Sequence, residues 1–145
     1  MNIYADTGFI VSLYTQDANS AAAAALMQRQ PHPAAWTRLH AAEFRNAIRL
    51  RHFRKEITRL DVAAVLQTQD ADLAAGIFSA EEPPWMKAWE EFERLSAAHT
   101  SILGTRSLDI LHVAQAVALG VKDFLTFDKR QAALAKAAGL RLMKL

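Results

Sequence analysis

The segment FLTFDKR at residues 124–130 begins as an apolar run and then stops on a carboxylate, Asp128. Such a short apolar run beside charged residues is typical of a strand that enters a core. The beginning of the chain has a similar pattern, since Ile3-Tyr4-Ala5 runs directly into Asp6. Two buried strands that each end on an aspartate predict that the two acids meet at one edge of a sheet.

The rest of the chain alternates between strand-like and helical patterns. Short apolar runs predict strands at residues 1–5, 34–37, 123–127 and 140–145. Helical spacing and composition predict helices at residues 18–29, 39–53, about 59–70, 107–119 and 129–138. A further predicted helix begins at Trp85 and has an apolar stripe that we expect to face the core, formed by Trp85, Ala88, Trp89, Phe92 and Leu95. Residues 73–84 are predicted to be irregular.

This alternation predicts one α/β domain over residues 1–145. The sheet should be parallel or mostly parallel and covered by helices on both faces. In such sheets ligands bind beyond the carboxyl ends of the strands, near the point where the strand order reverses. Asp6 and Asp128 both stand at such ends.

Composition narrows the kinds of site that the chain can build. Its 145 residues are 52% hydrophobic and 22% charged, as in a globular protein, and contain no cysteine. Disulfides and thiolate metal sites are therefore excluded, and a metal would need oxygen or imidazole ligands. No uncharged run is long enough for a membrane span, and the N-terminus lacks the pattern of a signal peptide, so we expect a cytoplasmic protein.

Positive charge is concentrated in one part of the chain. The net charge is only +2, but six of the 17 lysines and arginines lie between residues 45 and 59. Arginine binds phosphate with a bidentate fork, so this cluster favours an anionic partner. The solvated face of a surface helix is the alternative explanation.

Two more acids stand among apolar residues. Glu43 lies near the start of the helix predicted at residues 39–53, and Asp109 lies in the first turn of the helix predicted at residues 107–119. A buried, unpaired charge is strongly destabilising, so each carboxylate must face water, a hydrogen-bond donor or a metal.

Taken one at a time, the four acids have structural explanations. Asp6 and Asp128 could be helix N-caps, Asp109 could interact with the helix dipole behind a Ser107 cap, and Glu43 could pair with an arginine. Taken together, their segments resemble the PIN-domain nucleases, in particular the toxin ribonucleases of VapBC toxin–antitoxin pairs. The matching segments are YADTGFIVSLY at 4–14, HAAEFRNAI at 40–48, RSLDILHVAQAVALG at 106–120 and FLTFDKRQAALAKAAGL at 124–140.

The resemblance implies a PIN-like three-layer α/β/α sandwich with a mostly parallel central sheet of four or five strands. It implies that the acidic site consists of Asp6, Glu43, Asp109 and Asp128, with Thr7 and Thr126 as supporting residues. Asp6 and Asp109 would bind Mg²⁺ or Mn²⁺, and Glu43 and Asp128 would do so directly or through water. Neighbouring carboxylates repel each other, and a hard divalent ion relieves that repulsion.

The implied activity is that of a metal-dependent endoribonuclease, which hydrolyses RNA phosphodiester bonds with a metal-activated water. The implied partners are RNA, a small antitoxin protein and a second copy in a homodimer, with no membrane. Arg45 and Arg49, four residues apart on the helix of Glu43, are expected to contact the RNA backbone. Two alternatives stay open, namely a non-catalytic PIN-like module that binds RNA or protein, and an RNA-processing nuclease outside a toxin–antitoxin pair.

Other assignments are disfavoured by the residues themselves. An aspartyl-phosphatase needs a second acid two positions after Asp6, where Gly8 stands, and a receiver-type phospho-acceptor needs a pair of acids after the first strand. His112 follows Asp109 by three residues and therefore lies on a similar helix face. We expect it to be a hydrogen-bonded structural histidine and not a general base, because its neighbours are apolar and metal-dependent hydrolysis needs no imidazole.

Overall fold

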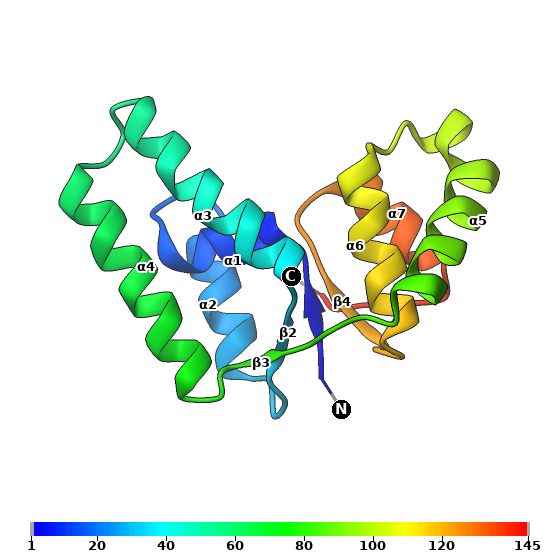
Figure 1. Ribbon diagram of the computed structural model, residues 1–145, viewed down its shortest axis with the longest axis horizontal. Helices are drawn as coiled ribbons and strands as arrows, with labels where there is room; N and C mark the ends of the chain where they lie inside the picture. Colours follow the sequence, from blue (N-terminus) through cyan, green and yellow to red (C-terminus); the bar gives the residue numbers. More distant parts are fainter. Residues whose placement is uncertain (1, 145) are drawn as a thin grey trace.

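The computed structural model describes residues 2–144, which form helices on both sides of a small central sheet (Figure 1). The elements in chain order are β1 (Tyr4–Ala5), α1 (Thr7–Tyr14), α2 (Ser20–Gln28), β2 (Ala34–Trp36), α3 (Arg38–Phe53), α4 (Arg59–Ala74), β3 (Phe78–Ala80), α5 (Trp85–Leu103), α6 (Ser107–Ala118), β4 (Asp123–Leu125), α7 (Lys129–Ala137) and β5 (Arg141–Leu142). The predicted outer ends of the first and last strands, Met1 and Leu145, lie outside the described residues.

All strand pairs in the described residues are parallel. β1 pairs with β4, β4 with β5 and β2 with β3, and a parallel bridge between Ile3 and Ala34 connects the two sets. The resulting order β3-β2-β1-β4-β5 confirms the predicted parallel sheet of four or five strands. The order reverses between β1 and β4, because the chain moves outward through β2 and β3 before it returns to the other side of β1.

Successive strand residues pack on opposite faces of the sheet. Ile3 and Ala5 belong to one buried cluster with residues of α1, α2 and α3, whereas Tyr4 belongs to another with residues of α5, α6 and α7. In β4, Leu125 joins the first cluster and Phe124 the second. This two-residue period buries both faces, as expected for a parallel sheet. It confirms the three-layer sandwich, with α1 to α4 on one side and α5 to α7 on the other (Figure 1).

Two observed elements are absent from the sequence prediction. Residues 7–14 form α1, although TGFIVSLY is rich in the β-branched and aromatic residues that favour strands. The Asp6 carboxylate accepts a hydrogen bond from the Phe9 amide at 2.7 Å, so the chain turns into a helix directly after β1. Residues 73–84, predicted to be irregular, contain β3, a three-residue strand that depends on β2 for its hydrogen bonds.

The apolar stripe of α5 lies mostly in or against the core, and the prediction is wrong only for Trp89. Ala88 and Leu95 are fully buried, but Trp89 is 52% exposed and Trp85 and Phe92 are partly buried. α5 packs on α6 and α7, and the stripe is wider than this contact.

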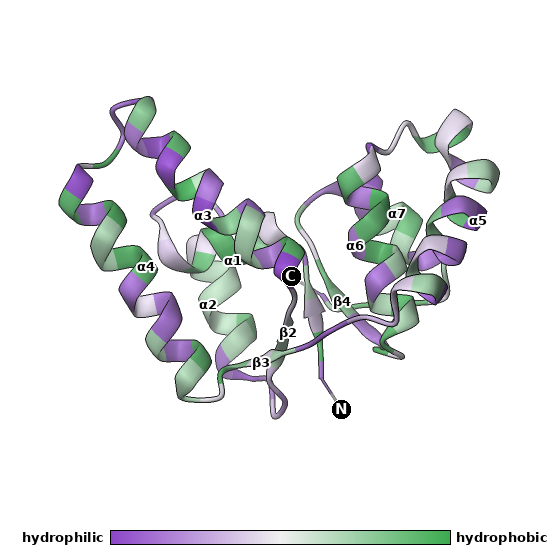
Figure 2. Ribbon diagram, in the orientation of Figure 1, coloured by the Kyte–Doolittle hydropathy of each residue, from purple (hydrophilic) through white to green (hydrophobic). Residues whose placement is uncertain are grey.

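Hydrophilic residues recur along α3 and α4, whereas α2 and α6 are mostly hydrophobic (Figure 2). No described helix is long and apolar enough to cross a membrane.

Candidate active site

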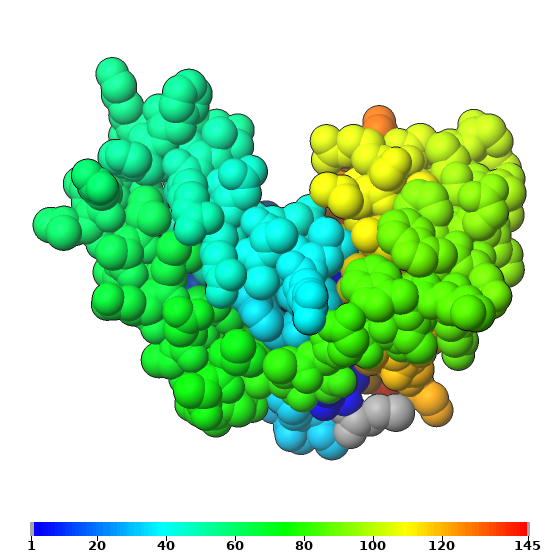
Figure 3. Space-filling view, viewed as in Figure 1, coloured from blue at the N-terminus to red at the C-terminus, as the bar shows by residue number. Residues whose placement is uncertain are grey.

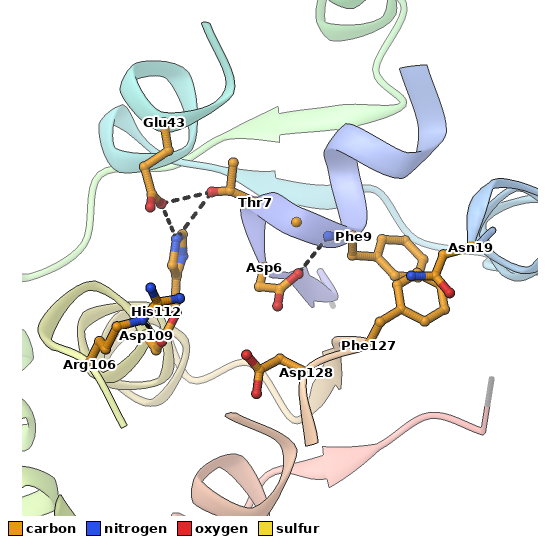
Figure 4. A pocket seen from close by; sticks show the side chains of 11 residues that line it. Asp6, Thr7, Phe9, Asn19, Glu43, Arg106, Asp109, His112, Phe127 and Asp128 are labelled. Carbon is orange, nitrogen blue, oxygen red and sulfur yellow. Dashed lines mark hydrogen bonds and ion pairs between the residues drawn. The ribbon is translucent and has the colours of Figure 1, made fainter. Parts of the chain in front are cut away.

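An open cavity of about 300 Å³ lies where β1 and β4 end, at the reversal of the strand order. The four predicted acids all line it and come from separate parts of the chain: Asp6 after β1, Glu43 on α3, Asp109 in the first turn of α6 and Asp128 before α7 (Figure 4). Figure 3 shows the surface hollowed between α3 and α6, the helices that carry Glu43 and Asp109. The fold therefore brings the four acids together, as their resemblance to a known site predicted.

Asp6 is the buried member of the set, at 7% exposure. Its Oδ1 accepts from the Phe9 amide, and its Oδ2 accepts from the Thr126 hydroxyl. Burial raises the pKa of the Asp6 carboxyl above its ordinary value, and the nearby Asp109 adds to this rise. The two hydrogen bonds and the imidazole of His112 act in the opposite direction without cancelling it. A carboxylate in this position would be stabilised by a cation.

Asp128 is exposed and forms the N-cap of α7. Its Oδ1 accepts from the amides of Arg130 at 2.8 Å and Gln131 at 3.0 Å. The amide of Asp128 in turn donates to Thr126 Oγ1 at 3.0 Å. Thr126 therefore connects Asp6 with Asp128 through a single hydroxyl. Asp6 and Asp128 are thus both helix caps and both cavity residues.

Asp109 is partly buried in the first turn of α6. Its Oδ2 lies 3.5 Å from Nε of Arg106, whose side chain is 85% exposed. The N-cap position of α6 is taken by Arg106 and not by Ser107, the cap that the sequence suggested. The carboxylate of Asp109 therefore faces the guanidinium of Arg106.

Glu43 is held by a network of Thr7, a predicted supporting residue, with His112 and Tyr4, which were not predicted to belong to the site. The Thr7 hydroxyl donates to Glu43 Oε1 at 2.9 Å, and Nε2 of His112 also contacts Oε1. On the other side of the imidazole, Nδ1 lies 2.8 Å from the Tyr4 hydroxyl. Partial burial raises the pKa of Glu43, but the hydrogen bond and charge of His112, with the bond from Thr7, outweigh burial and lower it overall.

His112 is therefore a structural histidine, as expected, but one that lines the cavity of the acids. It is 2% exposed, and its two ring nitrogens both face hydrogen-bonding partners. The sequence signal for this position was the spacing of three residues from Asp109, which puts both side chains on one face of α6.

Comparison with known proteins assigns the chain to a family. The profile of the PIN domain matches residues 3–137. The chain belongs to the PIN-domain family. This PIN domain is similar in fold to Mycobacterium tuberculosis VapC20, described as a toxin that cleaves the sarcin–ricin loop, with a TM-score of 0.67 and 17% identity over 91% of this chain and 94% of that one. It is also similar to FitAcB from Neisseria gonorrhoeae, with a TM-score of 0.68 and 16% identity over 98% of this chain and 96% of that one. No curated protein matches the sequence significantly.

The donor set of this PIN domain fits a hard divalent cation. Carboxylate oxygens are the ligands that Mg²⁺ and Mn²⁺ prefer, and the buried Asp6 has no ion pair with a lysine or arginine in the part of the chain that the structure describes. Within residues 2–144 no three acidic or imidazole groups already converge as a ligand cluster. Ion binding would therefore require rotation of some of these side chains.

The two arginines predicted to contact RNA do not line the acidic cavity of the PIN domain. Arg45 and Arg49 are exposed on α3. A neighbouring groove of about 380 Å³ is lined by Glu43 and by two other arginines of the α3 segment, Arg51 and Arg54. Arg51 lies 3.6 Å from Asp17 in an ion pair. The RNA contacts of Arg45 and Arg49 stay a prediction.

Proposed function

We propose that this PIN domain is a metal-dependent endoribonuclease whose carboxylates hold Mg²⁺ or Mn²⁺. The observation that carries the proposal is the convergence of Asp6, Glu43, Asp109 and Asp128 from separate elements on one open cavity. Capping and ion pairing explain each acid alone but do not explain why all of them line the same cavity. When bound, a divalent ion lowers the pKa of water and neutralises charge that develops on a phosphate.

The side chains around the acids have defined tasks in this proposal. Asp6 and Asp109 bind the ion directly, and Glu43 and Asp128 bind it directly or through water. Thr126 orients Asp6 through its hydroxyl hydrogen bond.

Glu43 is oriented from two sides. Thr7 donates to it, and His112 holds the same carboxylate oxygen while it contacts Tyr4. His112 is 2% exposed, so it acts on Glu43 and does not meet the substrate. Substitution of such partners of metal ligands typically lowers metal affinity or activity about 10–100-fold.

We further propose that the protein is the toxin of a toxin–antitoxin pair, a cytoplasmic homodimer controlled by a small antitoxin protein. The fold similarity to VapC20, described as a toxin that cleaves the sarcin–ricin loop, supports RNA as the substrate class. The exposed arginines of α3, including Arg45 and Arg49, would contact the RNA backbone without reading its sequence.

The test is an RNA cleavage assay on the purified protein. Structured and single-stranded RNAs are incubated with Mg²⁺, with Mn²⁺ and with EDTA, and the assay is repeated with Asp6→Asn and Asp109→Asn. We expect cleavage only with a metal, and a loss of at least about a hundredfold in both variants, the scale for removing one electrostatic stabiliser of a transition state. Asp70→Asn, at an exposed position of α4, is the matched control and should cleave like the wild type.

Circular dichroism establishes that all the variants remain folded. Equal activity in wild type and in folded Asp6→Asn and Asp109→Asn would refute the acidic site. A protein that binds RNA but cleaves none of it with either metal would favour the non-catalytic module.

A further inference from the structure

A second cavity, of about 490 Å³, adjoins the acidic cavity and has a basic character. Arg106, Asp109 and Asp128 line both cavities. The remaining lining of the second one is formed by Gly104, Thr105, Lys129 and Arg130. Two of the acids thus form the border between a cavity suited to a cation and one that carries positive side chains.

The N-terminus of α6 is the first feature that points to an anion. Arg106 occupies the N-cap position and makes no capping hydrogen bond with its side chain. The first amides of this 12-residue helix therefore lack a side-chain acceptor at the cap. The helix dipole already places partial positive charge there, and an arginine adds to it, which is unfavourable unless an anion is close. Asp109 compensates only in part, because the Arg106 side chain stays 85% exposed.

Thr105 is the second and independent feature. The residue is 6% exposed and lines the basic cavity, yet its Oγ1 has no hydrogen-bond partner among the described residues. Buried hydroxyls are nearly always paired, so the unpaired hydroxyl of Thr105 is available to donate a hydrogen bond to a ligand in the cavity.

Lys129 and Arg130 are the third feature. Both are exposed, and neither has an ion pair within residues 2–144. Nη1 of Arg130 lies 3.9 Å from the position that a Cβ would take on Gly104, so this guanidinium reaches back to the end of α5. Gly104 has a φ of +66°, which favours glycine at the rim of the cavity.

We propose that this basic cavity, the α6 subsite, binds a phosphate of the RNA strand next to the phosphate that is cleaved. The inference rests on the proposed nuclease function. Open helix amides, an unpaired hydroxyl and guanidinium groups are the donors that recognise phosphate. Because the two cavities share Asp109 and Asp128, neighbouring phosphates of one strand can occupy both. The α6 subsite would fix the register of the strand over the acids without reading its bases.

The first test measures RNA binding in EDTA, without reference to cleavage. Fluorescence anisotropy of a short labelled single-stranded RNA is compared between wild type and the double variant Lys129→Gln, Arg130→Gln. We expect the affinity to fall at least about tenfold, and the slope of log K against log salt to decrease by about 0.7 for each phosphate that the variant no longer neutralises. Lys87→Gln with Lys136→Gln removes the same charge from exposed positions outside the cavity and should change neither quantity by a comparable amount.

A second variant separates a ligand role from a structural one. Thr105→Val keeps the shape of the side chain and removes only the hydroxyl. Because that hydroxyl has no partner among the described residues, the melting temperature should not fall, while RNA affinity should fall roughly two- to tenfold. Thr100→Val, on α5, is the matched control for binding. A lower melting temperature with unchanged binding would make Thr105 a structural residue and overturn its place in the subsite.

Inorganic phosphate distinguishes a small anion from RNA. In NMR titrations the amides of Ser107 and Leu108 should shift with both phosphate and RNA, and the shifts should disappear in the double variant. A response to phosphate alone, or RNA binding that the double variant leaves unchanged, would overturn the assignment. If RNA binds through these residues but is never cleaved, the nuclease proposal fails and the subsite stands. If RNA is cleaved and the double variant binds like wild type, the subsite fails and the nuclease proposal stands.

Discussion

The substitution Asp6→Asn removes the charge of the only acid that is buried in the described structure while it keeps the size of the side chain. The N-cap of α1 is retained, because asparagine accepts a hydrogen bond from the Phe9 amide as well as aspartate does. The bond to Thr126 reverses, since the new amide donates to Thr126 Oγ1. The Thr126 hydroxyl can then turn to Gln131 Oε1, which lies 3.0 Å away. The two groups that contact Asp6, the Phe9 amide and the Thr126 hydroxyl, therefore keep hydrogen-bond partners.

The expected effect on stability follows from the removal of the charge. Burial raises the pKa of Asp6, so the metal-free folded state disfavours its carboxylate. A folded-state pKa above the unfolded-state value means that wild type loses stability as the pH rises between the two values, and the asparagine variant does not. At pH 8 in EDTA we expect the variant to be more stable by about 0.5–2 kcal/mol, the usual gain from relaxing a functional site. Each kcal/mol should raise the melting temperature by roughly 2–4 °C.

Urea unfolding and thermal melts at acidic pH and at pH 8 measure this difference, with cleavage assayed in parallel. The difference in free energy of unfolding between the variant and wild type should increase from acidic pH to pH 8. Mg²⁺ should then raise the melting temperature of wild type but not of the variant, because only wild type offers the carboxylate as a ligand. The variant should be inactive in spite of its higher stability. Asp70→Asn, at an exposed position, controls for the loss of one charge.

Two outcomes would refute this reasoning. If Asp6→Asn is less stable than wild type at pH 8 in EDTA, the ionised carboxylate stabilises the folded state. The burial of its charge would then not lower the free energy of unfolding as we infer. If Mg²⁺ stabilises wild type and variant equally, the ion binds elsewhere.

Other perturbations test the side chains around the acids. Thr126→Val removes the hydroxyl that holds Asp6 and should lower cleavage and apparent Mg²⁺ affinity about 10–100-fold, measured by titrating the metal in the cleavage assay. His112→Ala should lower cleavage on the same scale by releasing Glu43, and His112→Gln should retain more activity because its amide can still donate to that carboxylate. Burial lowers the pKa of His40 from 6.5 to about 3, so the free energy of unfolding should fall by up to about 1.4 kcal/mol for each pH unit below 6.5. Urea unfolding from pH 7 to pH 4 should show a smaller decrease for His40→Gln.

The layers of the fold could be predicted because their signals are periodic and local. The helix of Asp109 and the strands before Asp6 and Asp128 are strongly patterned, and the structure places them within a few residues of their predicted bounds. α1 was missed because its residues favour strands, whereas in the structure Asp6 caps the segment as a helix whose residues Phe9, Ile10 and Val11 are buried. β3 was missed because a three-residue strand is specified by its partner and not by its own sequence.

Individual contacts within the site could not be predicted in the same way. That the acids meet followed from strand ends and from the family resemblance, but the contact of His112 with Glu43 joins residues that are 69 positions apart. Nothing in the apolar surroundings of His112 in the sequence indicates which partner its Nε2 will face. Only the tertiary fold, which brings α3 and α6 to the same cavity, decides this, and such long-range contacts have no local sequence signal.

Two of the acids, Asp6 and Asp128, are also helix N-caps, so the sequence alone does not separate residues of the site from residues that stabilise the fold. A parallel strand that leads into a helix at the carboxyl edge needs an N-cap, and aspartate is among the best residues for that position. The cap of α1 and the cap of α7 therefore bring two carboxylates to the edge where ligands bind, at no cost to folding beyond the burial of Asp6. At the third helix of this edge, α6, the cap position carries Arg106 and the acid moves into the first turn. This departure from good capping weakens the helix locally, and it is the strongest indication that the N-terminus of α6 is built for a ligand and not only for stability.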